Sequence, residues 1–337
     1  MRKMPNIIDV AKRAGVAPIT VSRVINKSGY ASEATRKKVE EAIAELGYVQ
    51  NSLARGLRIK RTNTLALVVT DITNPFFTLI ARGVEDAASK AGYTVIYCNT
   101  DESEEKEISY SNILVQKQVD GVLLVPACSS PQSVRFLGQN NIPVVLIDRR
   151  VPDIHTDVVR CDSEEGAYNL VKLVIELGHR NIVTISGPQG VSTSDDRVAG
   201  YQRAMKEAGL GDNLNVLYGS FTQACGYDLA NQALALNPRP TALFGTNNFL
   251  SIGIMKALRD AGMRVPEDIT VIGFDDLPET MVVDPILTVA AQPAYKMGVL
   301  AAELLLKRLS EKMLPENQEI ILPTEIIERQ SSGPPLG

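Results

Sequence analysis

The side chains from residue 18 to residue 26 are of the types that contact bases and phosphates in DNA. Pro18 fits the first turn of a helix, where its missing N–H costs nothing. On that helix Val21, Val24 and Ile25 would share the inward face. The outward face would present Ile19, Thr20, Ser22 and Arg23. Hydroxyl and guanidinium groups on an exposed helix can donate hydrogen bonds to base edges and phosphates.

A preceding helix must position these side chains. Val10, Ala11 and Ala14 recur at helical spacing, so residues 7–14 are expected to form a helix with one apolar face. Gly15 follows as a turn residue that adopts a left-handed conformation at little cost. Two short helices joined in this way form a helix-turn-helix, whose second helix enters the major groove. The alternative interpretation is an ordinary helical pair in a globular domain.

A third helix is expected from Ser32 to Leu46, with Ser32 as its N-cap. From Ile7 to Arg58 the chain resembles the headpiece of the LacI/GalR family of bacterial transcription repressors. The residues that carry this resemblance are Asp9-Val10-Ala11, Ala14-Gly15-Val16, Thr20-Val21-Ser22-Arg23-Val24, Thr35-Arg36, Leu46-Gly47-Tyr48 and Leu53-Ala54-Arg55-Gly56-Leu57. The resemblance continues to about Arg329.

The resemblance implies roles for individual headpiece residues. Arg23 matches a base-reading arginine, for which bidentate contact to guanine is the commonest specific pairing. Pro18 and Ile19 match the positions that vary operator choice, and both are apolar here. Thr20, Ser22, Asn26 and Tyr48 would make phosphate or packing contacts. The full set of implied DNA-binding residues is Pro18, Ile19, Thr20, Ser22, Arg23, Asn26, Tyr48, Asn51, Ala54, Arg55, Leu57 and Arg58.

Residues 50–61 are expected to be a hinge helix and linker. A helix this short is unstable alone in water, and Gly56 weakens it by about 1 kcal/mol relative to Ala. The resemblance implies that it orders on DNA beside its twin from a second subunit. Leu57 would then wedge into the minor groove and kink the duplex. The alternative is a plain linker helix with Leu57 in an interdomain contact.

The charge of the chain is unevenly distributed. Up to Arg61 there are 13 Lys and Arg against 5 Asp and Glu, whereas the remainder has 22 against 34. A basic head on an acidic body suits a nucleic-acid module joined to a body that should not itself bind DNA.

Composition excludes several other classes of protein. No apolar run is long enough to cross a bilayer, and no secretion signal begins the chain, so we expect no membrane association. Cys98, Cys128, Cys161 and Cys225 lack the spacing of a zinc or disulfide framework, which favours reduced thiols and a cytoplasmic protein. When bound to DNA, such a protein would be associated with the nucleoid. No catalytic motif or metal-ligand cluster occurs, so we expect neither an enzyme nor a bound metal or cofactor.

From residue 64 onward, apolar strands alternate with helices. Helices are expected at 75–91, 104–117, 131–139, 164–177, 195–208, 224–234, 249–261 and 293–309. Strands are expected at 65–69, 94–98, 121–125, 144–147, 182–185, 216–218, 242–244 and 269–272, with a last strand near 320–328. Two such series predict an α/β core of two doubly wound parallel-sheet subdomains.

The expected domains are an all-α helix-turn-helix headpiece (1–49), the hinge (50–61), the effector-binding and dimerisation core (62–330) and a frayed tail (331–337). By resemblance the core is periplasmic-binding-protein-like, type I.

Ligands of doubly wound sheets bind beyond the carboxyl ends of the strands. Aromatic rings, planar amides, carboxylates and guanidiniums follow the expected strands, and these groups suit a sugar, whose hydroxyls both donate and accept. The core resembles the ribose-binding subgroup of the family. That resemblance implies the effector residues Asn74, Phe76, Phe77, Asp148, Arg149, Arg197, Phe221, Asn247, Asp275 and Gln292.

Alternatives remain for several of these residues. The three phenylalanines could be core, Asp148 and Arg149 a local salt pair, and Asp275 the cap of a turn. A ribose-like pentose is favoured over a hexose or sugar phosphate. A purine is disfavoured, because Val191 stands where the purine-responsive branch would carry an arginine and Arg149 where it would carry an aromatic residue.

We therefore expect a repressor that binds a pseudo-palindromic double-stranded operator as a homodimer. A tetramer is possible, although no tetramerising heptad follows Arg329. The effector would change the relation of the two subdomains and thereby the separation of the paired hinge segments, with release of DNA as the favoured result. A free sugar-binding receptor is the alternative class, but it would have no use for residues 1–60.

Overall fold

The computed structural model describes residues 5–26, 28–48, 61–277, 286–310 and 316–336. These residues divide into two compact units, one ending at Thr62 and one beginning at Asn63. The second unit consists of two subdomains, each built on its own sheet.

The first unit contains the three predicted helices, α1 (Ile7–Ala14), α2 (Pro18–Ile25) and α3 (Glu33–Leu46). Asn6 and Asp9 form a capping box at the start of α1, and Ser32 caps α3 as expected. Gly15 lies between α1 and α2 with a φ of 65°, which is the left-handed turn that the sequence predicts. One cluster holds the helices together, and its buried members are Val10, Ala11, Val21, Val24, Val39 and Ala42.

The first subdomain has a sheet of strand order β11-β5-β4-β3-β1-β2, and all its pairings are parallel. The strands are β1 (Thr64–Val69), β2 (Thr94–Asn99), β3 (Gly121–Leu124), β4 (Val144–Ile147), β5 (Asp157–Cys161) and β11 (Glu319–Leu322). Its helices are α5 (Pro75–Lys90), α6 (Glu104–Lys117), α7 (Gln132–Gln139) and α12 (Ala294–Ser310).

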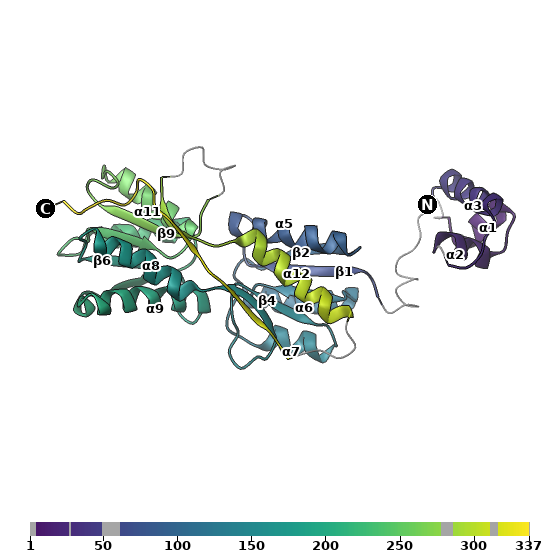
Figure 1. Ribbon diagram of the computed structural model, residues 1–337, viewed down its shortest axis with the longest axis horizontal. Coiled ribbons are helices and arrows are strands. Elements are labelled where there is room, and N and C mark those ends of the chain that lie inside the picture. Colours follow the sequence, from purple (N-terminus) through teal and green to yellow (C-terminus); the bar gives the residue numbers. More distant parts are fainter. Residues whose placement is uncertain (1–4, 27, 49–60, 278–285, 311–315, 337) are drawn as a thin grey trace. The chain divides into compact units, whose positions relative to one another are not determined.

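Both faces of this sheet are covered, as a continuous apolar strand requires. Leu65 and Leu67 of β1 pack in the cluster with α5 and α12, whereas Ala66 and Val68 pack in the cluster with α6 and α7. Figure 1 shows α5 and α12 side by side on the sheet.

The second subdomain has the strand order β12-β10-β9-β8-β6-β7. Its strands are β6 (Ile182–Ser186), β7 (Asn215–Tyr218), β8 (Ala242–Gly245), β9 (Thr270–Phe274), β10 (Thr288–Ala291) and β12 (Glu325–Ile327). All pairings are parallel except that of β12 with β10. One face carries α8 (Ser163–Glu176) and α9 (Ser192–Glu207), and the other carries α10 (Gln223–Leu234) and α11 (Asn248–Asp260). The fold class that the sequence predicts is therefore confirmed.

The end of the chain differs from the prediction in two ways. A single last strand near 320–328 is wrong, because β11 lies in the first sheet and β12 in the second, with Pro323 between them. Proline cannot donate a ladder hydrogen bond, so it suits the point where the chain leaves one sheet for the other. The chain also passes between the subdomains after β5 and after β10, two strands that sequence patterning missed.

The frayed tail predicted for 331–337 is also wrong for its described residues. Ser331 is fully buried; it accepts a hydrogen bond from the backbone N–H of Thr288 and donates one to the carbonyl oxygen of Val271. Nε2 of His179 lies 2.7 Å from the carbonyl oxygen of Gly333. The tail therefore extends the hydrogen bonding of the second sheet.

Within the described part of the chain, no helix is long and apolar enough to cross a membrane, and no group of His, Cys, Asp and Glu could hold a metal ion. All four cysteines carry free thiols.

Candidate functional site

A cavity of about 270 Å³ lies between the two subdomains, beyond the carboxyl ends of their strands. Its lining includes nine of the ten effector residues expected from the sequence: Asn74, Phe76, Phe77, Asp148, Arg149, Arg197, Phe221, Asn247 and Asp275. The tenth, Gln292, donates a hydrogen bond through Nε2 to Oδ1 of Asp275 at 2.6 Å. Residues from distant parts of the chain thus gather around one small site that has both polar and aromatic side chains.

Helix starts position several of these side chains. Asn74 caps α5, and its Oδ1 accepts a hydrogen bond from the N–H of Phe76 at 3.0 Å. Phe76 and Phe77 follow on the first turn, with ring centroids 5.1 Å apart in an edge-to-face arrangement. Asn247 caps α11 in the same way, through the N–H of Leu250. These caps therefore hold the rings and amides at the cavity wall.

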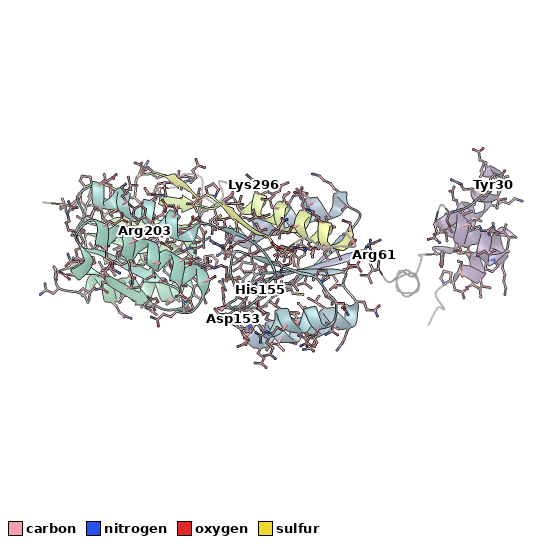
Figure 2. All side chains as sticks on the ribbon, turned by 60° about the horizontal axis from the view of Figure 1, so that its bottom comes forward. Tyr30, Arg61, Asp153, His155, Arg203 and Lys296 are labelled. Carbon is pink, nitrogen blue, oxygen red and sulfur yellow. The ribbon has the colours of Figure 1, made fainter. Side chains whose placement is uncertain are left out.

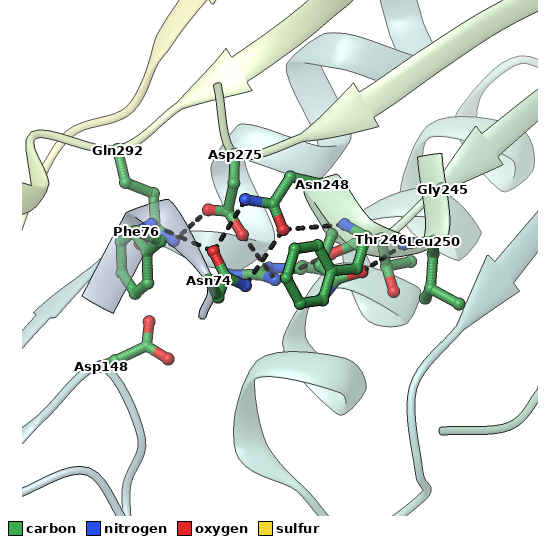
Figure 3. Close-up of polar contacts among 12 residues, drawn as sticks. Asn74, Phe76, Asp148, Gly245, Thr246, Asn248, Leu250, Asp275 and Gln292 are labelled. Atoms are coloured by element: carbon green, nitrogen blue, oxygen red, sulfur yellow. Dashed lines mark hydrogen bonds and ion pairs between the residues drawn. The ribbon is translucent and has the colours of Figure 1, made fainter. Parts of the chain in front are cut away.

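Two amides connect the subdomains at the cavity edge. Nδ2 of Asn74 donates to Oδ1 of Asn248 at 3.1 Å, and Nδ2 of Asn248 donates back to Oδ1 of Asn74 at 2.9 Å (Figure 3). Both side chains are buried. A second connection joins Arg150 to Asp196 at 2.6 Å and the N–H of Arg150 to the hydroxyl of Ser192 at 2.9 Å. These contacts depend on the separation of the subdomains, so a ligand that changes this separation must change them.

Asp148 lies in a sharp turn after β4. Its φ of 67° is left-handed, a conformation that Asp and Asn adopt more readily than other non-glycine residues. The carboxylate is buried, and its Oδ1 has no hydrogen-bond partner. Burial raises the pKa of Asp148 to about 6, against the opposing effect of Arg197 and Arg149. A ligand hydroxyl could donate the hydrogen bond that this buried oxygen lacks.

Asp275 occupies the equivalent turn after β9, with a φ of 69°. Its Oδ2 lies 3.8 Å from Nη1 of Arg197, which also donates to the carbonyl oxygen of Thr246 at 2.7 Å. The Arg197 guanidinium lies over the ring of Phe274 at 3.9 Å. Burial raises the pKa of Asp275, while Arg197 and the hydrogen bond from Gln292 act in the opposite direction. Asp275, Arg197 and Gln292 therefore form one connected polar group at the cavity. Figure 3 shows Gln292 beside Asp275.

Arg149 is oriented by a residue that the sequence analysis missed. Nη1 and Nη2 of Arg149 donate to the two carboxylate oxygens of Glu102 at 2.6 and 2.8 Å. The guanidinium also lies 5.2 Å from the ring centroid of Phe221. The salt pair of Asp148 with Arg149 that the sequence offers as an alternative is also present, with Nε of Arg149 3.9 Å from Oδ2 of Asp148, which is longer than the contacts with Glu102. The stronger partner comes from a different strand end, which no local pattern could indicate.

Other lining residues were also missed. They are Thr70, Asp71, Asp101, Thr193, Ser220, Thr222 and Phe249. Most lie directly after a strand or at a helix start. The rule that ligands bind beyond the carboxyl ends of the strands (the strand-end rule) could therefore have included them. Ser and Thr are common in loops, however, and the rule does not say which of them reach a ligand.

Among the ten expected effector residues, four buried polar atoms lack a hydrogen-bond partner, and Oγ1 of the lining residue Thr70 also lacks one. Two are acceptors, Oδ1 of Asp148 and Oε1 of Gln292, and two are donors, Nε of Arg149 and Nε of Arg197. An unpaired buried polar group costs about 1–3 kcal/mol, so each such atom favours a ligand that pairs with it. A molecule with several hydroxyls can both donate to the acceptors and accept from the donors.

Replacing Asp148 with Asn should stabilise the unliganded protein near neutral pH. The raised pKa means that folding favours the protonated carboxyl, so its stabilising contribution is present below pH 4 and is lost as pH rises through about 6. Asn cannot ionise and tolerates the left-handed turn. Thermal unfolding should show a higher Tm for the variant at pH 7.5 and a smaller difference at pH 4.5. An equal difference at both values would contradict the assignment.

The residues of α2 that are expected to contact DNA differ in exposure. Pro18, Ile19 and Arg23 are exposed on α2, with Ile19 at 55%. Thr20 and Ser22 are half-buried on the same helix, and Asn26 at its end donates to the carbonyl oxygen of Ser22.

Two tyrosines of this unit differ in environment. Tyr48 packs against the headpiece core, which favours the packing alternative for this residue. Tyr30, which follows the turn after α2, is 89% exposed (Figure 2). The predicted hinge and its residues Asn51, Ala54, Arg55, Leu57 and Arg58 lie outside the described residues.

The fold and the cavity define a class of protein, a helix-turn-helix headpiece joined to a two-lobed ligand-binding core. Residues 6–51 match the model described as "Bacterial regulatory proteins, lacI family", and residues 171–332 match a "Periplasmic binding protein-like domain". A curated relative, the HTH-type transcriptional repressor PurR of Aliivibrio fischeri (strain ATCC 700601 / ES114), is 38% identical over 97% of this chain and 98% of its own. The chain belongs to the LacI family of DNA-binding transcriptional repressors, which are regulators and not enzymes.

Solved structures agree in fold. The lac repressor dimer bound to operator and the anti-inducer ONPF matches with a TM-score of 0.85 at 25% identity, over 98% of this chain and all of that one. A LacI family transcriptional regulator from Enterococcus faecium with bound ribose matches with a TM-score of 0.73 at 31% identity, over 81% of this chain and 100% of its own. A transcriptional regulator CelR–cellobiose complex is 33% identical, with a TM-score of 0.72, and covers 97% of this chain and 99% of its own.

Proposed function

We propose that this repressor binds its operator as a homodimer and that a neutral, ribose-like pentose in the cavity controls its affinity for DNA. The observation that carries this proposal is a set of unpaired buried atoms at one cavity. Its donors are on Arg149 and Arg197 and one acceptor is on Asp148, all in the lining, while the other acceptor is on Gln292, which bonds the lining residue Asp275. Sugar hydroxyls pair with both kinds of atom at once.

The charge of the cavity favours a neutral ligand. Five carboxylates line it, on Asp71, Asp101, Glu102, Asp148 and Asp275, against the guanidiniums of Arg149 and Arg197. A phosphate or carboxylate would meet a net negative field inside a partly buried site, where charges are poorly screened. A sugar phosphate is therefore the less favoured alternative.

The size of the cavity favours a small sugar. At about 270 Å³ it lies just below the usual range of ligand pockets, which suits a single small ring. The phenylalanine rings offer apolar faces for C–H groups, while the carboxylates and amides accept from hydroxyls. The similar regulator from Enterococcus faecium was solved with bound ribose, which supports a pentose over a larger sugar.

A purine is the second candidate. The observation that favours it is the 36–38% identity to repressors named PurR. Two features of the site oppose it. Arg149, whose terminal nitrogens are bonded to Glu102, stands where an aromatic residue would stack on a base. Val191 is buried at the start of α9 and offers no donor.

A thermal-shift titration of the full chain separates these candidates. Ribose, glucose, ribose 5-phosphate, hypoxanthine and guanine would be added singly. At 100 times its Kd a ligand stabilises the folded state by about 2.7 kcal/mol. We expect the largest shift with ribose. A shift with a purine base and none with any sugar would refute the pentose proposal.

The dimer proposal rests on the edge of the first sheet. β2 is its terminal strand, and Ile96 and Tyr97 on it are each 39% exposed. Ile72, before α5, and Leu79, on α5, are also exposed. An exposed apolar edge strand invites pairing with a second copy. A two-fold symmetric protein then matches a pseudo-palindromic operator.

Effector control would act through the contacts between the subdomains. A ligand that pairs with both Asp148 and Asp275 changes the balance of the Asn74–Asn248 and Arg150–Asp196 contacts, which connect the same two lobes. A coupling of about 1–3 kcal/mol would change operator affinity about 5- to 150-fold. We propose release of DNA on binding, with the protein acting in the cytoplasm.

Replacing Arg23 with Ala should weaken binding to the specific operator by about 1–3 kcal/mol, because a bidentate contact to guanine is lost. Ribose binding, measured by calorimetry, should be unchanged. Arg13 is the matched control, since it is an exposed arginine on α1 that pairs with Glu45. Equal weakening by the Arg13→Ala and Arg23→Ala variants would show that only general charge is involved.

A further inference from the structure

Glu102 lies at the mouth of the cavity in an unusual loop. It follows Asp101 after β2, and φ is 51° at Asp101 and 57° at Glu102. Left-handed conformations in consecutive non-glycine residues carry strain, so surrounding contacts must hold them. Asp101 accepts from Asn99 and pairs with Lys106, and the N–H of Glu102 donates to the carbonyl oxygen of Thr70 at 3.3 Å. The loop is thus held in the shape that brings Glu102 to the cavity.

The Glu102 carboxylate occupies the two terminal nitrogens of Arg149. The distances are 2.6 Å from Nη1 and 2.8 Å from Nη2, and Nη1 also donates to the carbonyl oxygen of Pro126 at 2.9 Å. Only Nε of Arg149 is left without a hydrogen-bond partner. The Arg149 side chain is 5% exposed and that of Glu102 is 32% exposed. The pair therefore lines the cavity and leaves Nε–H and the second N–H of Nη2 as the donors of Arg149 for a ligand.

We propose that Glu102 is a specificity-determining residue, which positions Arg149 and keeps the cavity closed to anionic ligands such as sugar phosphates. This inference rests on the proposed function, because it concerns the choice between a neutral sugar and its phosphate at the same cavity.

The physical reason lies in the geometry of the guanidinium group. A free arginine binds phosphate or carboxylate through two parallel N–H donors. In this protein Glu102 occupies the end-on pair of N–H donors, one on Nη1 and one on Nη2, so a phosphate could take that edge only by displacing a charged, bidentate partner. Nε–H and the second N–H of Nη2 remain for a neutral hydroxyl. A phosphate on those two donors would bring its negative charge close to the Glu102 carboxylate. Glu102 therefore costs a neutral sugar little, and it opposes an anion by its charge and by its occupation of the end-on donors.

The test measures the ratio of two affinities in the full chain. Calorimetry would give the Kd of D-ribose and of D-ribose 5-phosphate for the wild type and the Glu102→Gln variant. We expect the ratio to shift at least about tenfold towards the phosphate, because one unit of charge is removed within a partly buried site. Glu102→Ala removes both acceptors and should shift the ratio at least as far. Glu102→Asp keeps the charge and should stay within about threefold of the wild type.

Glu105→Gln is the matched control. It removes the same charge three residues further on, from an exposed position in the first turn of α6. Its ratio should remain within about twofold of the wild type. An equal shift in this variant, or an unchanged ratio in both Glu102→Gln and Glu102→Ala, would overturn the proposal.

The outcomes separate this inference from the proposed function. If the wild type binds ribose and the ratio does not change, only the role of Glu102 fails. If the wild type binds no neutral sugar, the proposed function fails. Titration with inorganic phosphate then still decides the role of Glu102. Binding by the Glu102→Gln variant and not by the wild type would support it, and equal binding by both would refute it.

Discussion

Replacing Asp275 with Asn should lower the affinity for ribose about 30- to 100-fold. The carboxylate faces Arg197 at 3.8 Å and accepts from Gln292 at 2.6 Å in a buried setting. Removing one partner of such a group leaves a buried charge unpaired, which costs 2–5 kcal/mol in comparable interfaces. Asn is preferred to Ala because it tolerates the φ of 69° at this position. The substitution therefore removes the charge and leaves the turn intact.

Calorimetry with ribose measures this loss of affinity. A binding assay with operator DNA then tests whether DNA binding is retained. Operator binding without ligand should persist, so the variant should repress whether or not ribose is present. Asp260→Asn, on the exposed end of α11, is the control and should leave both activities unchanged. Ribose affinity within threefold of the wild type in the Asp275 variant would remove Asp275 from the site.

Replacing Gly298 with Ala should destabilise the core by about 3 kcal/mol or more. A Cβ at this position would lie 2.1 Å from the backbone carbonyl oxygen of Ile80, where α12 crosses α5. Gly83 faces α12 in the same way, with a Cβ that would lie 2.2 Å from the carbonyl oxygen of Tyr295. Backbone cannot move aside as a flexible side chain can, so the two helices must separate and lose packing on the first sheet.

Thermal unfolding should show a fall in Tm of roughly 6–12 °C for the Gly298→Ala variant. Gly138→Ala is the matched control. It lies in α7, where an added Cβ meets nothing within 4 Å, and alanine has the higher helix propensity. The control should be neutral or slightly stabilising. Equal Tm values for the two variants would show that the α5–α12 crossing can adapt.

Local patterns predicted most of the elements. The headpiece follows from apolar spacing, Gly15 and Pro18, because short helices with defined caps are specified by neighbouring residues. The strands buried on both faces, such as β1 and β4, were found because each is a continuous apolar run. β5 was missed because Asp157 and Arg160 interrupt its apolar pattern. Asp157 is buried there with Arg308 of α12 and the backbone N–H of Gln318 as partners of its carboxylate.

The residues of the candidate site also divide into those that the sequence predicted and those that it did not. The strand-end rule and the family resemblance together found Asn74, Asp148 and Asp275, because each sits at a position that sequence order defines. Asn248 and Glu102 were missed because their roles come from partners 174 and 47 residues away. Their assignment depends on which strand ends meet across the cleft.

The order of residues alone therefore specified a DNA-reading headpiece, a two-sheet core and the residue types at the strand ends, since these depend on periodicity and caps within a few residues. Folding in three dimensions set the rest: which carboxylate holds Arg149, which buried atoms stay unpaired, and where the last segment divides between two sheets. Those outcomes depend on distances between remote segments. Packing sets these distances, and local sequence does not encode them.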